Sequence, residues 1–409
     1  MMRSRWRGAL AVGFASMLVL GACGGSDSDG ASSDGGSGTT AADGGGDSGG
    51  FTLACSETTP EASGDAAPIK LQLQWFTQAQ FAGYYAALDQ GFYEDMGLDV
   101  EIVEGGTDIV PQTVLADGDA DFAIAWVPKA LQSIEAGAGI TDISQVFQRS
   151  GTLQVSWADS DITTAKDLDG KKVGNWGFGN EFELFAGITK AGLDPATDVT
   201  LVQQDFDMKA LLNNDIDAAQ AMTYNEYAQV LEAVNPDTGE LYTEDDFNVI
   251  NWNDEGTAML QDAIWANTEQ LTSDKEYCDN AVRFTAASLE GWAYCRDNAD
   301  DCVKGVLDKG SQLGESHQAW QMNEINKLIW PSHADGAGTV EKDLWDQTVE
   351  VAKGTKNADG TTVITDDPPE SAYTGDVNAK ALELLKAKDV DVVGDDFEAA
   401  TIELKEGGE

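Results

Sequence analysis

The segment from Leu71 to Gly106 contains the pattern that most limits how this chain can fold. Apolar and polar residues alternate from Leu71 to Trp75 and again from Leu98 to Ile102, as they do in half-buried β-strands. Between these two alternations, apolar residues recur at helical spacing from Phe81 to Leu88. A strand, a helix and a strand in so short a segment form a βαβ unit. Such a unit requires a parallel sheet and therefore an α/β fold.

Two helix starts have the residue spacing of a capping box. Thr77 and Gln80 precede the first predicted helix, and Asn180 and Glu183 precede a later one. In a capping box the two side chains bond each other's backbone N–H groups at the first turn. We therefore expect a helix to begin at each pair.

The same order of elements occurs a second time along the chain. Each run has a Leu-x-x-x-Asp-x-Asp sequence before its third strand, at Leu115–Asp121 and at Leu211–Asp217. The repeat predicts two similar lobes, each a mostly parallel sheet flanked by helices. The strands expected besides those above are 122–126, 172–176, 199–203 and 218–222. The helices expected with them are 110–115, 128–136, 181–191, 208–213 and 225–233.

The rest of the chain is predicted to return to the first lobe. A strand is expected at 261–267, and helices at 278–297, 299–309, 318–330, 345–353 and 376–388. We place the first lobe at residues 51–157 and 255–354, the second lobe at 158–254, and a C-terminal wrap at 355–409. Two crossovers would then act as the hinge.

The first fifty residues have the composition of a lipoprotein leader and tether. Residues 1–22 have a basic start and an apolar run too short to span a bilayer, so we interpret them as a cleavable signal peptide. Leu20-Gly21-Ala22-Cys23 resembles the bacterial lipobox, which implies lipidation of Cys23 and a membrane anchor. Residues 23–50 follow as a Gly/Ser/Asp-rich flexible tether. The alternative is a plain secretory signal with an incidental cysteine.

The chain is strongly acidic, with a formal charge of −48. Such a surface repels nucleic acid, so no nucleic-acid partner is expected. The simplest interpretation is a solvated acidic shell suited to a salty or extracellular setting. The alternative is that the charge helps to recognise a cationic ligand.

The cysteines predict structural disulfides. With Cys23 lipidated, four cysteines remain, which allow three pairings. We favour Cys295–Cys302, which flank the turn RDNADD, and by elimination Cys55–Cys278, as bonds of an oxidising compartment. Four free buried thiols are the alternative.

Four clusters of aromatic and polar residues lie at the carboxyl ends of predicted strands, where open α/β sheets bind ligands. Aromatic rings offer flat faces, and amides and carboxylates offer directional hydrogen bonds. The alternative is that each cluster taken alone serves only the core or caps a helix. The candidates are Gln74, Trp75, Gln78, Phe81 and Tyr84; Trp126 with Val127 and Pro128; Asn175–Glu183, including Trp176, Asn180 and Glu181; and Met222–Glu226, including Tyr224, Asn225 and Glu226.

The four clusters contain no Lys or Arg, so they favour a neutral nitrogen heterocycle over an anion. The glycines around Trp176 depart from a dinucleotide loop, because Phe182 occupies the third glycine position. The sequence has no zinc-binding spacing, P-loop or nucleophile elbow. We therefore expect no cofactor, no metal and no catalytic residue.

Two consecutive sequence motifs resemble those of periplasmic substrate-binding proteins related to sulfonate binders and thiamine-pyrimidine synthase. They are QWxxQAQFAGYY and, after it, GFYxxxGLDVxIxxGG. The resemblance extends from about residue 68 to the C-terminus. It implies a type II two-lobed fold with the ligand cleft between the lobes, and an ABC permease and ATPase as partners. Relatives with these motifs serve transporters of riboflavin or of pyrimidine precursors of thiamine.

The resemblance also implies ligand-binding residues. GNEFEL and MTYNE resemble segments of the riboflavin- and pyrimidine-binding relatives, which would place Trp176, Asn180, Glu181, Tyr224, Asn225 and Glu226 in or beside the pocket. Met259-Leu260-Gln261-Asp262 resembles the family's segment that returns to the first lobe. This resemblance adds Asp262 to the expected ligand-binding residues. The synthase's cysteine-rich motif is absent and no histidine precedes His317, so its self-consuming chemistry is not expected.

These observations together predict a lipid-anchored, monomeric solute-binding protein of an ABC importer on the outer face of a bacterial membrane. Its ligand would be riboflavin or a thiamine-type pyrimidine. One alternative is a ligand-binding sensor without transport, and another is a binder of a different small solute such as a sulfonate. An enzyme ranks third.

Overall fold

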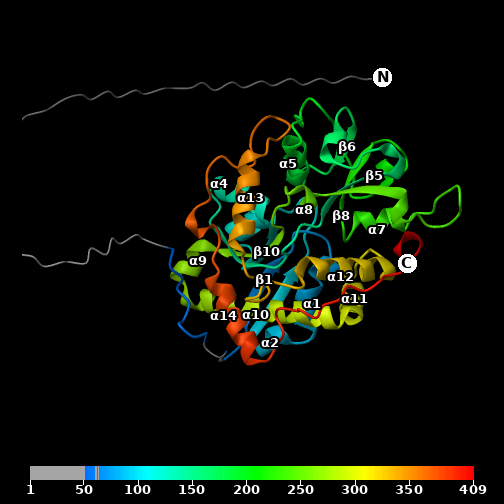
Figure 1. The fold of residues 1–409 in the computed structure, drawn as a ribbon. Coiled ribbons are helices and arrows are strands. Elements are labelled where there is room, and N and C mark those ends of the chain that lie inside the picture. The colour runs from blue at the N-terminus through cyan, green and yellow to red at the C-terminus, as the bar shows by residue number, and fades with distance from the viewer. Residues whose placement is uncertain (1–50, 60–61, 63, 178) are drawn as a thin grey trace, which may run out of the picture. The chain divides into compact units, whose positions relative to one another are not determined.

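The computed structural model describes residues 51–59, 62, 64–177 and 179–409, and it contains two five-stranded sheets (Figure 1). The predicted signal peptide, Cys23 and the tether lie outside the described residues. The first sheet has the order β2-β1-β3-β10-β4 and the second β7-β6-β8-β5-β9. Their strands are β1 (Ala67–Gln72), β2 (Leu98–Val103), β3 (Phe122–Trp126), β4 (Ile140–Gln145) and β10 (Asp262–Asn267); and β5 (Thr152–Trp157), β6 (Lys172–Asn175), β7 (Thr200–Gln203), β8 (Ala218–Met222) and β9 (Phe247–Asn251).

The two sheets have the same topology, which confirms the predicted two-lobed α/β fold. In each sheet four strands run in one direction, and the strand that follows a crossover, β10 or β5, is inserted antiparallel among them. We call the two halves the first lobe and the second lobe after their sheets. Because β5 pairs with β8 and β9, the predicted lobe boundary at residue 157 is wrong. The first crossover lies between Gln145 and Thr152, and the return crossover between Asn251 and Asp262.

The repeated Leu-x-x-x-Asp-x-Asp sequence has the same physical role in both lobes. The Asp121 carboxylate accepts a hydrogen bond of 2.7 Å from the backbone N–H of Lys70, and the Asp217 carboxylate accepts one of 2.7 Å from that of Lys172. The backbone N–H of each aspartate donates back to the carbonyl of the same lysine. This reciprocal pair joins the start of the third strand to the first strand, so the motif sets the register of both sheets.

The helices lie close to the predicted ranges, but both predicted capping boxes are absent. The Thr77 hydroxyl bonds Tyr85 and Glu104, and Glu183 bonds Ser150 and Met259 instead of a first turn. The helices are α1 (Ala82–Asp89), α2 (Phe92–Asp95), α3 (Pro111–Ala116), α4 (Val127–Glu135), α5 (Phe182–Lys190), α6 (Lys209–Leu212), α7 (Glu226–Leu231), α8 (Trp252–Glu255), α9 (Thr268–Ser273), α10 (Lys275–Asp297), α11 (Ala299–Asp308), α12 (Glu315–Ile329), α13 (Lys342–Gly354) and α14 (Asp376–Ala387). The 3₁₀ turns used below are η1 (Ala79–Phe81) and η6 (Glu406–Gly408).

Two glycines allow the equivalent helices α1 and α5 to pack closely against tryptophans. A Cβ at Gly83 would come within 2.2 Å of the Trp292 ring, and one at Gly187 within 2.2 Å of the Trp252 ring. Both tryptophans are fully buried. Such distances leave no room for any side chain larger than hydrogen, so these glycines are required by packing.

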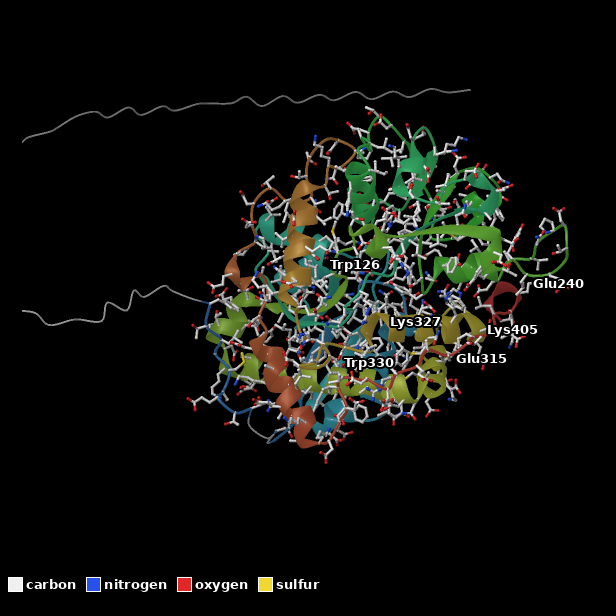
Figure 2. The ribbon with its side chains drawn as sticks, in the orientation of Figure 1. Trp126, Glu240, Glu315, Lys327, Trp330 and Lys405 are labelled. Atoms are coloured by element: carbon white, nitrogen blue, oxygen red, sulfur yellow. A yellow bond between two sulfur atoms is a disulfide. The ribbon has the colours of Figure 1, made fainter. Side chains whose placement is uncertain are left out.

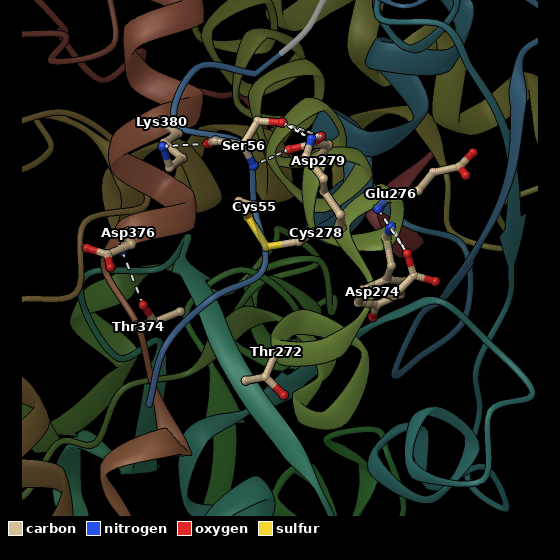
Figure 3. Close-up of a disulfide and its surroundings, with 12 residues drawn as sticks. Cys55, Ser56, Thr272, Asp274, Glu276, Cys278, Asp279, Thr374, Asp376 and Lys380 are labelled. Atoms are coloured by element: carbon tan, nitrogen blue, oxygen red, sulfur yellow. Dashed lines mark hydrogen bonds and ion pairs between the residues drawn. A yellow bond between two sulfur atoms is a disulfide. The ribbon is translucent and has the colours of Figure 1, made fainter. Parts of the chain in front are cut away.

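Both favoured disulfides, Cys55–Cys278 and Cys295–Cys302, are present. The first joins the segment before β1 to helix α10 (Figure 3). Beside it, the Ser56 backbone N–H and hydroxyl each donate to Asp279 at 2.8 Å. The Lys380 ammonium on α14 donates to the carbonyls of Ser56 and Glu57. The disulfide and the Asp279 bonds therefore attach this segment to α10, and the Lys380 bonds attach helix α14 to the same segment.

Among the residues that the structure describes, no helix has both the length and the apolar character needed to cross a membrane.

The Asp142 carboxyl in β4 is a buried acid whose ionisation opposes folding. It is fully buried, and burial raises its pKa to about 8, while it accepts one hydrogen bond from the Ser144 backbone N–H. In an unfolded chain an aspartate has a pKa of about 3.9. Between these two values the folded state holds the extra proton, so Asp142 makes stability fall as the pH rises from about 4 to 8.

We therefore predict that the melting temperature of Asp142→Asn minus that of the parent increases as the pH rises from 5 to 8. The relative change should be about 2 °C or more, on the scale at which 1 kcal/mol shifts a chain of a few hundred residues. Scanning calorimetry at both pH values measures it. Asp159→Asn, at an exposed surface acid, is the control and should show no such trend. Equal shifts of Asp142→Asn at both pH values would contradict the prediction.

Candidate functional site

A cavity of about 960 Å³ lies between the two lobes, at the carboxyl ends of their parallel strands. All four predicted clusters contribute to its wall, as do two segments that were not predicted, Gly106–Gln112 and Asn357–Asp359. The other lining residues are Gln74, Trp75, Gln78, Gln80, Trp126, Lys129, Gln132 and Ser133 from the first lobe, and Asn175, Trp176, Gly179–Phe182, Phe185, Leu201, Gln203, Phe206, Met222 and Tyr224–Glu226 from the second.

Most of the predicted site residues lie on this wall, but three do not. Phe81 is fully buried in the first lobe, and Tyr84 packs its ring against Trp292 at a centroid distance of 5.6 Å. Both point from the first helix into the core, so their prediction as ligand contacts is not supported by their position. Asp262 lies directly behind the wall. Those on the wall are Gln74, Trp75, Gln78, Trp126, Trp176, Asn180, Glu181, Tyr224, Asn225 and Glu226.

Asp262, the first residue of β10, holds three wall side chains in place. One carboxylate oxygen accepts from Gln74 Nε2 at 2.6 Å and from Trp126 Nε1 at 2.7 Å, and the other accepts from Gln80 Nε2 at 3.0 Å. Burial raises the pKa of Asp262 to about 7, although these hydrogen bonds favour the ionised form. Figure 2 labels Trp126 near the middle of the view, while Glu240 and Lys405 lie near its edge.

Lys129 is a cation of the cavity wall that the sequence analysis missed. Its Nζ donates to Asn180 Oδ1 at 2.6 Å and lies 5.1 Å from the centroid of the Trp126 ring. Burial lowers the pKa of Lys129 to about 8, against the opposing effect of Glu181 and Asp262. It directly follows Trp126-Val127-Pro128, so the same strand-end argument could have included it. Because Lys129 is in α4 and Asn180 precedes α5, this bond joins the two lobes.

Glu226 places an acid on the opposite side of the wall. Its carboxylate accepts from the Met222 backbone N–H at 3.0 Å and from Asn225 Nδ2 at 2.8 Å. Burial raises the pKa of Glu226 to about 7. Burial also raises the pKa of Glu181, another acid of the wall.

Aromatic rings close the wall from both lobes. The Trp75 ring of the first lobe lies 4.6 Å from the Phe206 ring of the second, and Phe206 stacks on Trp176 at 6.1 Å between centroids. The buried Trp176 Nε1 and Gln112 Oε1 have no hydrogen-bond partner among the described residues. A buried polar atom without a partner is costly, so each offers a ligand one unused hydrogen bond.

This arrangement is suited to binding a flat, largely uncharged molecule. Rings stack on both sides, amides and acids supply donors and acceptors, and Lys129 is the one cation among the described lining residues. A strongly anionic ligand would bring its charge close to Glu181 and Glu226, which is unfavourable in a buried site. The four predicted clusters contain no basic residue, but Lys129 lies on the wall beside them, and acids still outnumber cations there.

The hydrogen bond between Asp262 and Trp126 makes a spectroscopic prediction. Protonation of Asp262 near pH 7 should change the tryptophan emission, because the indole N–H loses a charged partner. A fluorescence titration should show a transition with a midpoint near pH 7 that Asp262→Asn and Trp126→Phe both remove. Glu183→Gln is the control and should keep the transition. Burial also raises the pKa of Glu183 to about 7, but this carboxyl bonds Ser150 and Met259 and not Trp126. Persistence of the transition in Asp262→Asn would contradict the assignment.

Three curated proteins are similar to this chain in sequence. The riboflavin-binding protein RibY of Chloroflexus aurantiacus is 25% identical over 313 residues, which cover 72% of this chain and 85% of that protein. The formylaminopyrimidine-binding protein of Halalkalibacterium halodurans is 20% identical, over 63% of this chain and 75% of that protein. A putative thiamine biosynthesis protein of Haemophilus influenzae is 26% identical over 37% of this chain, and the match spans only 48% of that protein.

Solved structures share the fold at low sequence identity. A putative periplasmic sulfonate-binding protein, SsuA, of Methylobacillus flagellatus aligns with a TM-score of 0.55 and 16% identity, over 83% of this chain and 100% of that one. The desulfurization enzyme DszB aligns with a TM-score of 0.50 and 12% identity, over 77% and 99%. These alignments show the two-lobed fold and nothing finer, because proteins of one fold carry different functions.

The profile of the family described as NMT1/THI5 like matches residues 78–301, which is more than half of the chain and includes strand ends from both lobes. The chain therefore belongs to the NMT1/THI5-like family and has the two-lobed fold of periplasmic substrate-binding proteins.

Proposed function

We propose that this chain is an extracytoplasmic solute-binding protein of an ABC importer, which captures a small neutral nitrogen heterocycle and delivers it to the permease. The observation that carries the proposal is the cavity between the lobes, with aromatic rings on both sides and amide and carboxyl groups around them. Ligand sites of this kind are concave and mostly apolar, with a few placed polar groups.

Riboflavin is the leading ligand. A volume of about 960 Å³ lies near the upper end of the roughly 300–1,000 Å³ found for small-molecule sites, so the cavity has room for a three-ring flavin and its side chain. The similarity to RibY extends over 72% of this chain, which supports the same choice. A thiamine-type pyrimidine is second, supported by the similarity to the formylaminopyrimidine-binding protein.

Closure of the two lobes on the ligand would signal the loaded state to the permease. Two contacts already join the lobes at the cavity, the Trp75–Phe206 ring pair and the Lys129–Asn180 hydrogen bond. A ligand that contacts both lobes binds the closed form better than the open form, and it therefore shifts the population toward closure.

The first test is a calorimetric titration of residues 51–409 with riboflavin. We expect a dissociation constant in the micromolar range or tighter, with quenching of tryptophan emission as the flavin stacks in the cavity. Riboflavin 5′-phosphate is the matched control, and its added negative charge should weaken binding by about tenfold or more, or about 1.4 kcal/mol. If folded protein gives no heat with riboflavin, riboflavin is not the ligand, and hydroxymethyl- or formylamino-pyrimidines become the proposed ligands.

Substitutions in the wall test the site. Trp176→Ala and Asn180→Ala should each weaken riboflavin binding by about tenfold or more, because a stacked ring and a buried hydrogen bond each contribute roughly 1–3 kcal/mol. Trp157→Ala is the control, since Trp157 stacks on Phe247 in the second lobe and does not line the cavity. Titration of Trp176→Ala and Asn180→Ala with riboflavin at parent affinity would refute the site.

A sensor lipoprotein without transport is the second candidate, because a closing two-lobed receptor serves signalling equally well. Uptake of labelled riboflavin by cells that lack the gene separates the two. The importer predicts a fall in uptake, and the sensor predicts unchanged uptake. A sulfonate ligand is disfavoured by the acids around Lys129, and an alkanesulfonate added to the titration should give no heat. A catalytic role would require turnover of an added aminopyrimidine.

The membrane anchor is tested separately at Cys23. We predict that Cys23→Ser abolishes labelling of the protein by a radioactive fatty acid. The variant protein should also leave the membrane fraction for the soluble fraction, because lasting attachment requires more than one acyl chain on that cysteine. Ser26→Ala, in the same segment, is the control and should leave both unchanged. Membrane retention of Cys23→Ser would show that another part of the chain holds it there.

A further inference from the structure

His317 lies outside the cavity wall, yet a chain of hydrogen bonds connects it to that wall. It is near the start of helix α12 and is buried, with 1% of its surface exposed. Helix α12 is bonded to the first lobe: Gln318 Oε1 accepts from the Ala79 backbone N–H at 2.7 Å, and Gln321 Oε1 accepts from that of Gln80 at 3.3 Å. The His317 ring itself points to the second lobe, where it contacts the residues around helix α7.

The hydrogen-bond chain runs through three side chains of the second lobe. Glu232 Oε1 lies 2.8 Å from His317 Nδ1, and Asn225 Oδ1 lies 2.9 Å from His317 Nε2. Asn225 Nδ2 in turn donates to Glu226 Oε1 at 2.8 Å, and Asn225 and Glu226 both line the cavity. A residue of one lobe thus reaches an acid on the ligand-facing wall of the other.

The donors and acceptors in this chain have a definite direction. An ionised carboxylate only accepts hydrogen bonds, so Asn225 must turn its NH₂ group toward Glu226. The amide oxygen of Asn225 is then left to accept, and the N–H at Nε2 of His317 is the donor that it meets. Glu232 holds the imidazole from its other side. Without His317, the Asn225 amide oxygen loses its donor, and the amide is held only by its bond to Glu226.

The C-terminal turn covers this pair. Gly408 lies so close that a Cβ there would come within 2.9 Å of the His317 Cβ and within 3.2 Å of the Glu232 carboxylate. The Lys405 backbone N–H donates to Ser316 Oγ, and Figure 2 shows Lys405 beside Glu315 at the start of α12. With little room left around it, the imidazole is held in one orientation.

We propose that His317 is a positioning residue of the ligand cavity, which fixes the Asn225 amide and so keeps Glu226 as an acceptor for an N–H group of the ligand. The inference rests on the proposed function, and it defines the ligand class more narrowly as a heterocycle that carries a ring N–H or an amino group. Each oxygen of Glu226 has one recorded donor, Asn225 or Met222, and a carboxylate oxygen has room for a second. Glu226 can therefore accept from a ligand without losing its protein contacts.

The two halves of the imidazole can be replaced separately. In His317→Gln the side-chain amide nitrogen reaches the place of Nε2, so the donor to Asn225 is kept and the contact with Glu232 is lost. In His317→Asn the amide nitrogen takes the place of Nδ1, so the contact with Glu232 is kept and the donor to Asn225 is lost. Each variant loses one buried hydrogen bond, so both should lower the melting temperature by a similar amount.

The measurement is riboflavin affinity of the purified protein. We expect His317→Gln to bind within about threefold of the parent and His317→Asn to bind about tenfold or more weakly, or about 1.4 kcal/mol. For 3-methylriboflavin, which lacks the ring N–H, the two variants should bind alike, because the effects are coupled through Glu226. His333→Asn, at the other histidine of the sequence, is the control and should bind as the parent does.

A second readout requires no ligand. In protein labelled with ¹⁵N-asparagine, the side-chain resonance of Asn225, identified by its loss in Asn225→Asp, should exchange slowly with water in the parent and in His317→Gln and rapidly in His317→Asn. Equal loss of affinity in both variants, or slow exchange in His317→Asn, would overturn the positioning role. A parent that does not bind riboflavin would instead refute the proposed ligand, and the exchange measurement would still decide the role of His317.

Discussion

The wall of the cavity depends on the carboxyl group of Asp262. The chain leaves the first lobe after β4, builds the second lobe, and returns at Asp262 to complete the first sheet. The two carboxylate oxygens of Asp262 accept three hydrogen bonds, from Gln74 after β1, from Gln80 in η1 and from Trp126 at the end of β3. One carboxyl group thus fixes both the returning strand and the cavity-lining side chains. Each of its side-chain hydrogen bonds orients a residue of the wall, which compensates for its burial.

The fold was largely predictable because each lobe repeats a short βαβ pattern with clear periodicity. β3 and β8 lie at the predicted residues, and most helices differ by only a few residues at their ends. β4, β5 and β9 were not predicted. β4 and β5 are almost entirely buried yet contain polar side chains such as Asp142, Ser144 and Gln154, so they show neither alternation nor an apolar run. Ser144 bonds Asn378 of α14, and Gln154 bonds the Gly174 carbonyl of β6, and no local pattern reveals partners so distant in sequence.

The site was predictable to the extent that it follows from strand ends. Trp126, Trp176 and Tyr224 were identified because large aromatic side chains at the carboxyl end of a parallel strand usually line the crevice there. The prediction did not capture which way the side chains at the start of the first helix point, since Phe81 is buried in the core and Tyr84 packs on Trp292 of α10. The segment Asn357–Asp359 reaches the cavity from a part of the chain far away in sequence, and only the assembled fold brings it there.

Buried acids recur wherever the two lobes meet. Glu183 accepts from Ser150 on one crossover and from Met259 on the other, Asp262 holds the first lobe's wall, and Glu226 stands on the second lobe's wall. Burial raises the pKa of each of the three to about 7.

The partners of these acids are mostly neutral N–H and O–H groups, which matches a chain with 72 acidic and 24 basic residues. Carboxyls bonded in this way can still accept from further N–H groups, and they are partly ionised near neutral pH. A junction of this kind disfavours anions because it has few cations to neutralise them, and its carboxyl oxygens can accept from the N–H groups of a flat molecule. The groups that join the lobes are therefore also the groups on which the proposed choice of ligand rests.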